Sequence, residues 1–200
     1  MFRTSPSIAR SAAAQRGFTI IELMVVVGIL AILVGLAAPS FQPLIERWRV
    51  KGTTEELQHS LYTARSQAIL TGGNIVIVKN DTSGTCVSTG NDDWSCGWRF
   101  YWDADRDGNQ AACTAANQSE CTIRESSPSP NTLLAVAPND NGRLFMDRSG
   151  RIVNRTTGAP INNLSMDVIA KNKTLADLSS RRLCITGPGK YKQVKGYESC

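Results

Sequence analysis

An apolar run near the start of the chain constrains its fold more than any other feature of the sequence. The 21 residues from Phe18 to Ala38 are almost all apolar, and their one acid is Glu22. As an α-helix this run would be about 31 Å long, which matches the hydrocarbon thickness of a bilayer. A carboxylate in such a segment costs roughly 2.5–3.5 kcal/mol on insertion scales, so it indicates a specific role. We expect a membrane-spanning helix over residues 18–38.

The residues before this run differ from an ordinary secretory signal. Residues 1–16 contain Arg3, Arg10 and Arg16 and no acid. The apolar run is too long for the hydrophobic region of such a signal, and no A-x-A cleavage site follows it. We therefore expect residues 1–17 to be a basic leader that is removed, while the apolar helix is kept.

The stretch from Gly17 to Leu23 is Gly-Phe-Thr-Ile-Ile-Glu-Leu, followed by the apolar run and Pro39. It resembles the leader and N-terminal helix of type IV pilins and pseudopilins. The resemblance implies cleavage after Gly17 by prepilin peptidase and N-methylation of Phe18. It also implies storage in the bacterial inner membrane as a single-pass protein with its head in the periplasm, before assembly into a filament. The alternative is a plain anchor that happens to contain an acid.

Glu22 lies about one helical turn beyond Phe18, where a lone carboxylate in lipid would be an uncompensated charge. In a filament of parallel helices it could neutralise the terminal amine of a neighbouring subunit and so register the helices. The resemblance implies this assembly role for Glu22.

Residues 39–73 are expected to continue the helix in amphipathic form. Pro39 should bend or loosen it, Gly52-Thr53-Thr54 is a second weak point, and Gly72-Gly73 predicts its end. The apolar residues recur at steps of three and four, as in a helix packed on one side: Leu44, Ile45, Trp48, Leu57, Leu61, Ala64 and Ala68.

After this helix the pattern changes to short β-like runs broken by polar turns. Asp147-Arg148-Ser149-Gly150 predicts a hairpin turn, and residues 126–130 predict a linker. We expect an α+β fold of the type IV pilin kind: a long N-terminal helix, with a protruding apolar half and a packed amphipathic half, against an antiparallel β-sheet head formed by residues 74–200. Strands are expected over 74–79, 97–103, 122–125, 133–136, 143–146, 151–153, 164–170 and 182–186.

Six cysteines lie in the head, and an even number outside the cytoplasm favours disulfides. Several connectivities are open, but sequence proximity favours Cys86–Cys96, Cys113–Cys121 and Cys184–Cys200. A cysteine metal site is disfavoured because no C-x-x-C occurs and the single histidine, His59, is far away in sequence.

Short motifs follow one another in the second half of the chain: Gly97-Trp98-x-Phe100, Asp103-x-Asp105-x-Asp107-Gly108, Phe145 with Gly150-Arg151, and Arg182-x-Cys184-Ile185 before Gly189. In this order they resemble the FimT/GspH group, which comprises minor pilins and type II secretion pseudopilins.

The segment from Asp103 to Gly108 is similar to the opening of a calcium loop, with acids at alternate positions and a glycine at the sixth. The twelfth position should be an acid, but here it is Thr114. Asp and Gly are also ordinary turn formers. We expect a polar hairpin loop with no metal, and calcium binding stays open as the alternative.

Nothing in the sequence predicts catalysis or a cofactor. No G-x-S-x-G, P-loop or cysteine-nucleophile motif is present, and His59 is expected on the surface of the helix between Leu57 and Leu61. We expect a protein that is not an enzyme.

Positive charge is concentrated at the C-terminal end. Gly187-Pro188-Gly189 predicts a turn, and in an extended segment after it Lys190 and Lys192 would project on one side about 7 Å apart. That is close to the phosphate spacing of a nucleic acid strand. The last twenty residues contain one acid, Glu198, and five basic residues, Arg181, Arg182, Lys190, Lys192 and Lys195.

The family resemblance implies a function for this tail. FimT members of some naturally transformable bacteria bind DNA through a C-terminal Gly-Arg-x-Arg motif, and Gly189-Lys190-Tyr191-Lys192 is similar to it with lysine for both arginines. Because lysine binds phosphate as a point charge, binding to duplex DNA should be sequence-independent and salt-sensitive. The alternative is a solubilising or subunit-contacting tail.

Three functions remain on this basis. The first is a minor pilin of a type IV pilus that contacts duplex DNA for uptake in natural transformation. The second is a GspH-type minor pseudopilin of a type II secretion system. In both, the partners are other pilins or pseudopilins and prepilin peptidase. A membrane-anchored enzyme is third, and the lack of an active-site constellation counts against it.

Overall fold

The computed structural model describes residues 17–114, 120–128, 130–186 and 189–200. These residues form two compact units, the first ending at Phe41 and the second spanning Gln42–Cys200. The leader expected over residues 1–17 lies outside the described residues except for Gly17.

The first unit contains the α-helix α1 (Ile20–Ala37) and the short 3-10 helix η1 (Ala38–Phe41). Thr19 caps α1: its Oγ1 accepts a hydrogen bond from the backbone N–H of Glu22 at 3.2 Å. By length and composition α1 could cross a membrane, and none of its residues is buried. The interruption of the α-helix at η1 lies where Pro39 was expected to loosen it.

The second unit begins with α2 (Gln42–Thr71). As predicted, Leu57, Leu61, Ala64 and Ala68 are buried, but the earlier members of the apolar stripe, Leu44, Ile45 and Trp48, are exposed. The helix also continues without a break through the predicted weak point at Gly52. Buried contacts stabilise it there, since Thr54 is fully buried and its hydroxyl donates to the carbonyl oxygen of Val50 at 2.8 Å.

α2 ends where the glycine pair predicted it to end. The N–H of Gly73 donates to the carbonyl oxygen of Ala68 at 2.7 Å, which closes the last turn. Gly73 has a φ of 105°, and a Cβ there would lie 2.8 Å from the backbone nitrogen of Arg148. Only glycine fits this close approach, which turns the chain from the helix into the first strand.

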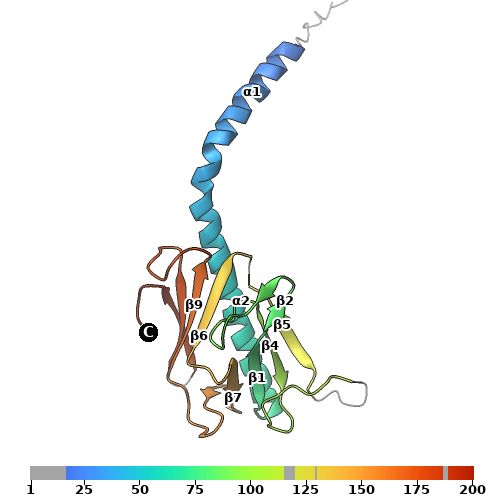
Figure 1. Ribbon diagram of the computed structural model, residues 1–200, viewed down its shortest axis with the longest axis vertical. Helices are drawn as coiled ribbons and strands as arrows, with labels where there is room; N and C mark the ends of the chain where they lie inside the picture. Colours follow the sequence, from blue (N-terminus) through green and yellow to red (C-terminus); the bar gives the residue numbers. More distant parts are fainter. Residues whose placement is uncertain (1–16, 115–119, 129, 187–188) are drawn as a thin grey trace, which may run out of the picture. The chain divides into compact units, whose positions relative to one another are not determined.

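Two antiparallel sheets pack on α2 (Figure 1). The first has the order β5 (Thr122–Ser126), β4 (Trp98–Trp102), β1 (Ile75–Lys79), β7 (Arg143–Met146) and β8 (Ile152–Val153). The second has the order β11 (Lys190–Lys195), β10 (Arg181–Thr186), β9 (Asn163–Ala170) and β6 (Thr132–Ala137). A small hairpin joins β2 (Thr82–Ser83) to β3 (Cys86–Val87).

The α+β fold class is therefore confirmed, while the head has two main sheets rather than one. The hairpin predicted at Asp147–Gly150 is present: β7 pairs with β8, and the Gly150 N–H donates to the Asp147 carbonyl oxygen at 2.8 Å. The linker expected over 126–130 begins with the last residue of β5, and its residue 129 lies outside the described part.

One hydrophobic core joins α2 to both sheets. Its members alternate with exposed residues along β6 and with mostly half-buried residues along β9, as expected for strands with one buried face. The core includes Leu57, Leu61, Ala64, Ile75, Trp98, Phe100, Leu134, Leu144, Met166, Val168, Leu183 and Ile185.

All six cysteines are paired, as Cys86–Cys96, Cys113–Cys121 and Cys184–Cys200. These are the pairings that sequence proximity favours. The third joins β10 to the last residue of the chain and so ties the C-terminal end to the second sheet.

Candidate functional site

The basic residues of the C-terminal end lie mainly on β11, which forms one edge of the second sheet. Among the described strands β11 pairs only with β10, in a register that places Lys190 opposite Thr186 and Lys192 opposite Cys184. The Lys190 and Lys192 side chains are exposed. The turn predicted just before this strand includes residues 187 and 188, which lie outside the described residues.

Lys190 and Lys192 project from the same face of the sheet, because side chains two residues apart in a strand do so. Their ammonium-bearing side chains leave the backbone about 7 Å apart. Cys184 lies on this face as well, and its disulfide to Cys200 ties the end of the chain to it. Within the part of the chain that the structure describes, neither lysine forms an ion pair.

The aromatic ring between these lysines lies on the opposite face. Tyr191 packs against the core, and its ring meets that of Tyr62 on α2 edge-on, with centroids 4.9 Å apart. Burial raises the pKa of Tyr191 to about 12. This ring therefore anchors the strand and is not presented together with the lysines.

The two arginines of β10 differ in their surroundings. Arg182 lies on the face of Lys192, but it forms a two-pronged ion pair with Asp167 on β9, with Nε–Oδ1 at 2.6 Å and Nη2–Oδ2 at 3.0 Å. Asp167 raises the pKa of Arg182 and neutralises its charge locally. Arg181 lies opposite Lys195 on the other face.

Lys195 and Arg181 therefore form a separate pair at the far end of β11. The ammonium group of Lys195 lies over the ring of Tyr197, 5.7 Å from its centroid. Arg181 donates to the carbonyl oxygens of Leu178 and Ser180. The structure thus brings Lys190 and Lys192 together, with Arg182 on the same face but paired with Asp167, and places Arg181 and Lys195 on the other face.

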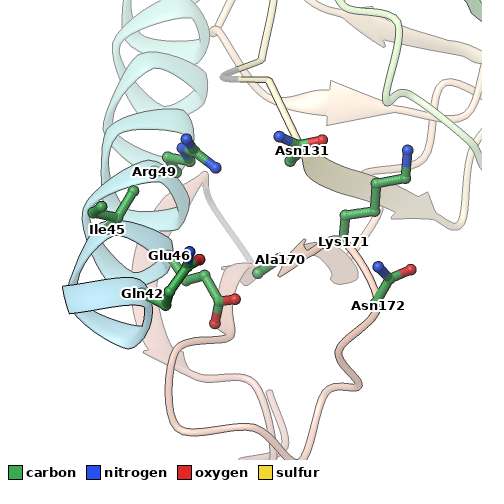
Figure 2. A pocket seen from close by; sticks show the side chains of 8 residues that line it. All are labelled: Gln42, Ile45, Glu46, Arg49, Asn131, Ala170, Lys171 and Asn172. Carbon is green, nitrogen blue, oxygen red and sulfur yellow. The ribbon is translucent and has the colours of Figure 1, made fainter. Parts of the chain in front are cut away.

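A shallow pocket of about 190 Å³ lies beside the first turns of α2 (Figure 2). Its charged groups include both signs, and Glu46 is paired with Lys173 at 3.7 Å. None of the residues named as its lining is a histidine, cysteine or serine. The lining consists of Gln42, Ile45, Glu46, Arg49, Asn131, Ala170, Lys171 and Asn172.

The residues predicted for processing and assembly lie at the start of the first unit. Gly17 and Phe18 precede α1, and Phe18 is exposed. Glu22 is exposed in the first turn of α1, three residues after Thr19. A threonine cap followed by a glutamate at this spacing is a capping-box pattern, which the family motif alone did not reveal.

Known family models match two parts of the chain. Residues 53–189 match the family model of the type II transport protein GspH, and residues 12–38 match that of the prokaryotic N-terminal methylation motif. A fimbrial protein of Pseudomonas aeruginosa is 46% identical over 63 residues. This match covers 32% of the chain and spans only 40% of the length of that relative.

The chain also resembles solved structures of a minor pilin and a minor pseudopilin. The type IV minor pilin FimU of Pseudomonas aeruginosa aligns with a TM-score of 0.51 and 19% identity, over 79% of this chain and 97% of that one. The minor pseudopilin EpsH from the type 2 secretion system of Vibrio cholerae aligns with a TM-score of 0.48 and 12% identity, over 75% and 99% of the two chains. FimU supports the fold. Because the GspH model covers more than half of the residues, this chain belongs to the GspH family of minor pilins and pseudopilins.

Proposed function

We propose that the chain is a minor pilin of a type IV pilus. In this proposal prepilin peptidase cleaves after Gly17, Phe18 is N-methylated, and the protein waits in the inner membrane with its head in the periplasm. α1 then enters the filament core beside the helices of other pilins. The match to the N-terminal methylation motif supports this route, as does a helix whose apolar side chains are all exposed within the chain.

We further propose that the head contacts duplex DNA through its basic edge strand during uptake in natural transformation. One observation supports this most: Lys190 and Lys192 project together from an exposed edge, with no acid paired to them among the described residues. Lys195 and Arg181 add positive charge at the other end of the strand. Arg182 contributes little because Asp167 neutralises it. Contacts of this kind to phosphates give affinity without sequence preference.

The test is a DNA-binding titration of the Lys190→Gln, Lys192→Gln double variant at several salt concentrations. We expect binding to duplex DNA to be about tenfold weaker at low salt. The slope of log K against log salt concentration should fall by the equivalent of about two phosphate contacts. A matched control is the Arg148→Gln, Lys171→Gln variant, which removes the same charge from exposed positions outside β10 and β11. Equal affinities of the two variants would refute the DNA contact.

The alternative is a GspH-type pseudopilin of a type II secretion system, which the name of the matching family model favours. The two functions differ in what a deletion strain loses. A pilus subunit for DNA uptake predicts reduced transformation with normal protein secretion. Reduced secretion with normal transformation would instead establish the pseudopilin.

A further inference from the structure

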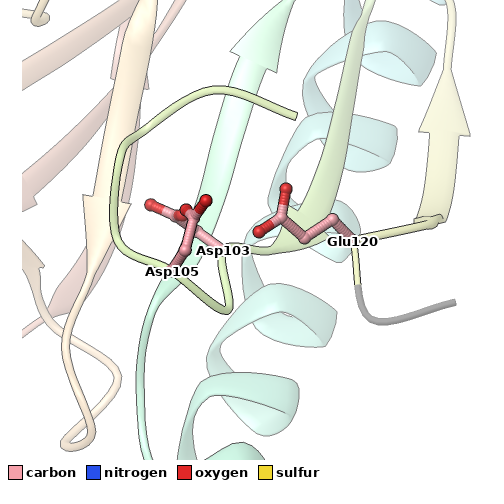
Figure 3. A group of neighbouring side chains, drawn as sticks. All are labelled: Asp103, Asp105 and Glu120. Carbon is pink, nitrogen blue, oxygen red and sulfur yellow. The ribbon is translucent and has the colours of Figure 1, made fainter. Parts of the chain in front are cut away.

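Three carboxylates lie close together beside the end of β4, which belongs to a different sheet from the basic strand β11. Asp103 directly follows β4, Asp105 is two residues further on, and Glu120 lies two residues before β5. One oxygen from each side chain lies within 4.8 Å of the other two. Figure 3 shows Asp103 and Asp105 close together, with Glu120 facing them from a different segment.

Two of these acids are buried, since Asp103 and Glu120 are each only 3% exposed. Like charges at this separation repel strongly when they are shielded from water. A cation or a proton that lies between these carboxylates would relieve the repulsion.

One buried oxygen of the cluster has no hydrogen-bond partner in the part of the chain that the structure describes. Oδ2 of Asp103 accepts a hydrogen bond from the Gly108 N–H at 3.0 Å, whereas Oδ1 has no hydrogen-bond partner among the described residues. Buried polar atoms in native proteins are nearly always partnered. The Asp103 side chain lies beside two further carboxylates, which cannot donate to this oxygen while they are ionised. Its partner is therefore a cation, a shared proton or a water molecule.

Glu120 keeps bonding capacity for such a partner. Its Oε1 accepts the N–H of Ala104 at 3.1 Å, and its Oε2 accepts the N–H of Ala111 at 2.7 Å. Each carboxylate oxygen can accept a second interaction. The two backbone bonds therefore hold Glu120 in place without using up its oxygens.

We propose that Asp103, Asp105 and Glu120 bind a calcium ion. Calcium takes oxygen ligands at about 2.3–2.6 Å, so two oxygens on opposite sides of one ion lie about 5 Å apart. Three oxygens that each lie within 4.8 Å of the other two fit around one such ion. A divalent cation supplies the partner that Oδ1 of Asp103 lacks, and a proton shared between Asp103 and Asp105 is its competitor. Water molecules complete the coordination.

The structure also explains how the site forms without an acid at the twelfth position of the loop. Glu120 supplies the carboxylate that Thr114 cannot, from a segment six residues further along the chain. Cys121, its direct neighbour, is bonded to Cys113, which ties this segment back to the loop. Asp107, the third acid of the motif, is not in the cluster, because its carboxylate accepts hydrogen bonds from Asn109 instead.

The test uses the full-length protein in detergent micelles, titrated with calcium chloride in a calorimeter. We expect binding with a Kd of about 0.1–1 mM, the range of extracellular calcium modules, and a melting temperature that is higher in calcium than in EDTA. Asp105→Asn should weaken calcium binding about tenfold without lowering the melting temperature in EDTA, because Asp105 is exposed and its loss removes one of three neighbouring like charges.

The matched control is Asp107→Asn, the same substitution two residues away in the same loop. It should bind calcium as the unmodified chain does. Absence of both heat and stabilisation at about 10 mM calcium would overturn the proposal. Equal weakening by Asp105→Asn and Asp107→Asn would overturn it too, because it would show a diffuse charge effect rather than coordination by the cluster.

Discussion

Nη1 of Arg65 donates a hydrogen bond to the carbonyl oxygen of Gly189 at 2.8 Å, which joins α2 to the residue before β11. Gly189 is buried, its φ is 86°, and a Cβ there would lie 3.1 Å from the same nitrogen. A few residues away, Tyr62 and Tyr191 make a second contact between the same two elements. The helix therefore sets where the basic strand begins on the head.

Replacing Arg65 with alanine should lower the free energy of unfolding by about 1–3 kcal/mol, because the buried carbonyl of Gly189 would lose its donor. Urea denaturation of the two proteins measures this difference. Arg148→Ala is the control: Arg148 is exposed, and its loss should change the free energy of unfolding by less than about 0.5 kcal/mol. Equal stabilities of the two variants would show that the Arg65 bond contributes nothing.

The second prediction concerns the ion pair between Arg182 and Asp167. Replacing Asp167 with asparagine frees the charge of Arg182 on the face of Lys190 and Lys192. We expect a lower free energy of unfolding but several-fold tighter binding to duplex DNA. The slope of log K against log salt concentration should be steeper by the equivalent of about one phosphate contact. Gel-shift titrations at two salt concentrations measure both effects.

Asp147→Asn provides the matched control for this change. Asp147 pairs with Arg151 at 2.8 Å in the β7–β8 hairpin, so its loss also frees one arginine, but on another sheet. DNA affinity should rise less in this variant than in Asp167→Asn. If both variants gain equally, net charge alone explains the binding and the face of Lys190 has no special role.

Local sequence patterns predicted most of the fold. The step of three and four residues from Leu57 to Ala68, followed by two glycines, was enough to predict a helix that ends at Thr71, because both signals depend on near neighbours. Strand β11 was not among the predicted strands, since its lysines are typical of exposed edges and its pairing with β10 depends on a distant segment. The division of the strands into two sheets also depends on pairing between distant segments, so it could not be predicted from local patterns.

The same is true of the candidate sites: features that depend on near neighbours could be predicted, and those that depend on distant segments could not. Strand periodicity alone predicted that Lys190 and Lys192 share a face. The inward packing of Tyr191 depends on α2, and the neutralisation of Arg182 depends on β9, so neither could be predicted from the tail itself. Glu120 was missed because it lies outside the calcium-like motif. An acid next to a loop-closing cysteine was the only local signal for it.

The alkaline limit of stability gives a third prediction. Burial raises the pKa of Tyr101 to about 12, with a contribution from Asp103, and burial does the same for Tyr191. An unfolded tyrosine ionises near pH 10. The native state therefore keeps protons that the unfolded state releases, and stability is lost as the pH rises from about 10 through 12.

Phenolate absorbance measures this directly. Two of the four tyrosines should titrate near pH 12 in the native protein, and Tyr101→Phe should remove one of them. In urea all four should titrate together near pH 10. Native tyrosines that all titrate near pH 10 would contradict the burial of these two rings.

The fourth prediction separates two roles of Glu22. Its backbone N–H donates to Thr19 and caps α1, while its side-chain carboxylate is proposed to neutralise the terminal amine of a neighbouring subunit. Glu22→Gln keeps the backbone bond but removes the charge, so it should insert into the membrane normally and enter filaments poorly. Thr19→Val removes the cap at a cost of about 1 kcal/mol but keeps the charge, so it should enter filaments far better than Glu22→Gln. The amount of each variant in sheared pili, relative to the amount in the inner membrane, measures the difference. Normal incorporation of Glu22→Gln would rule out the charge contact, because the backbone at this position is the same in both proteins.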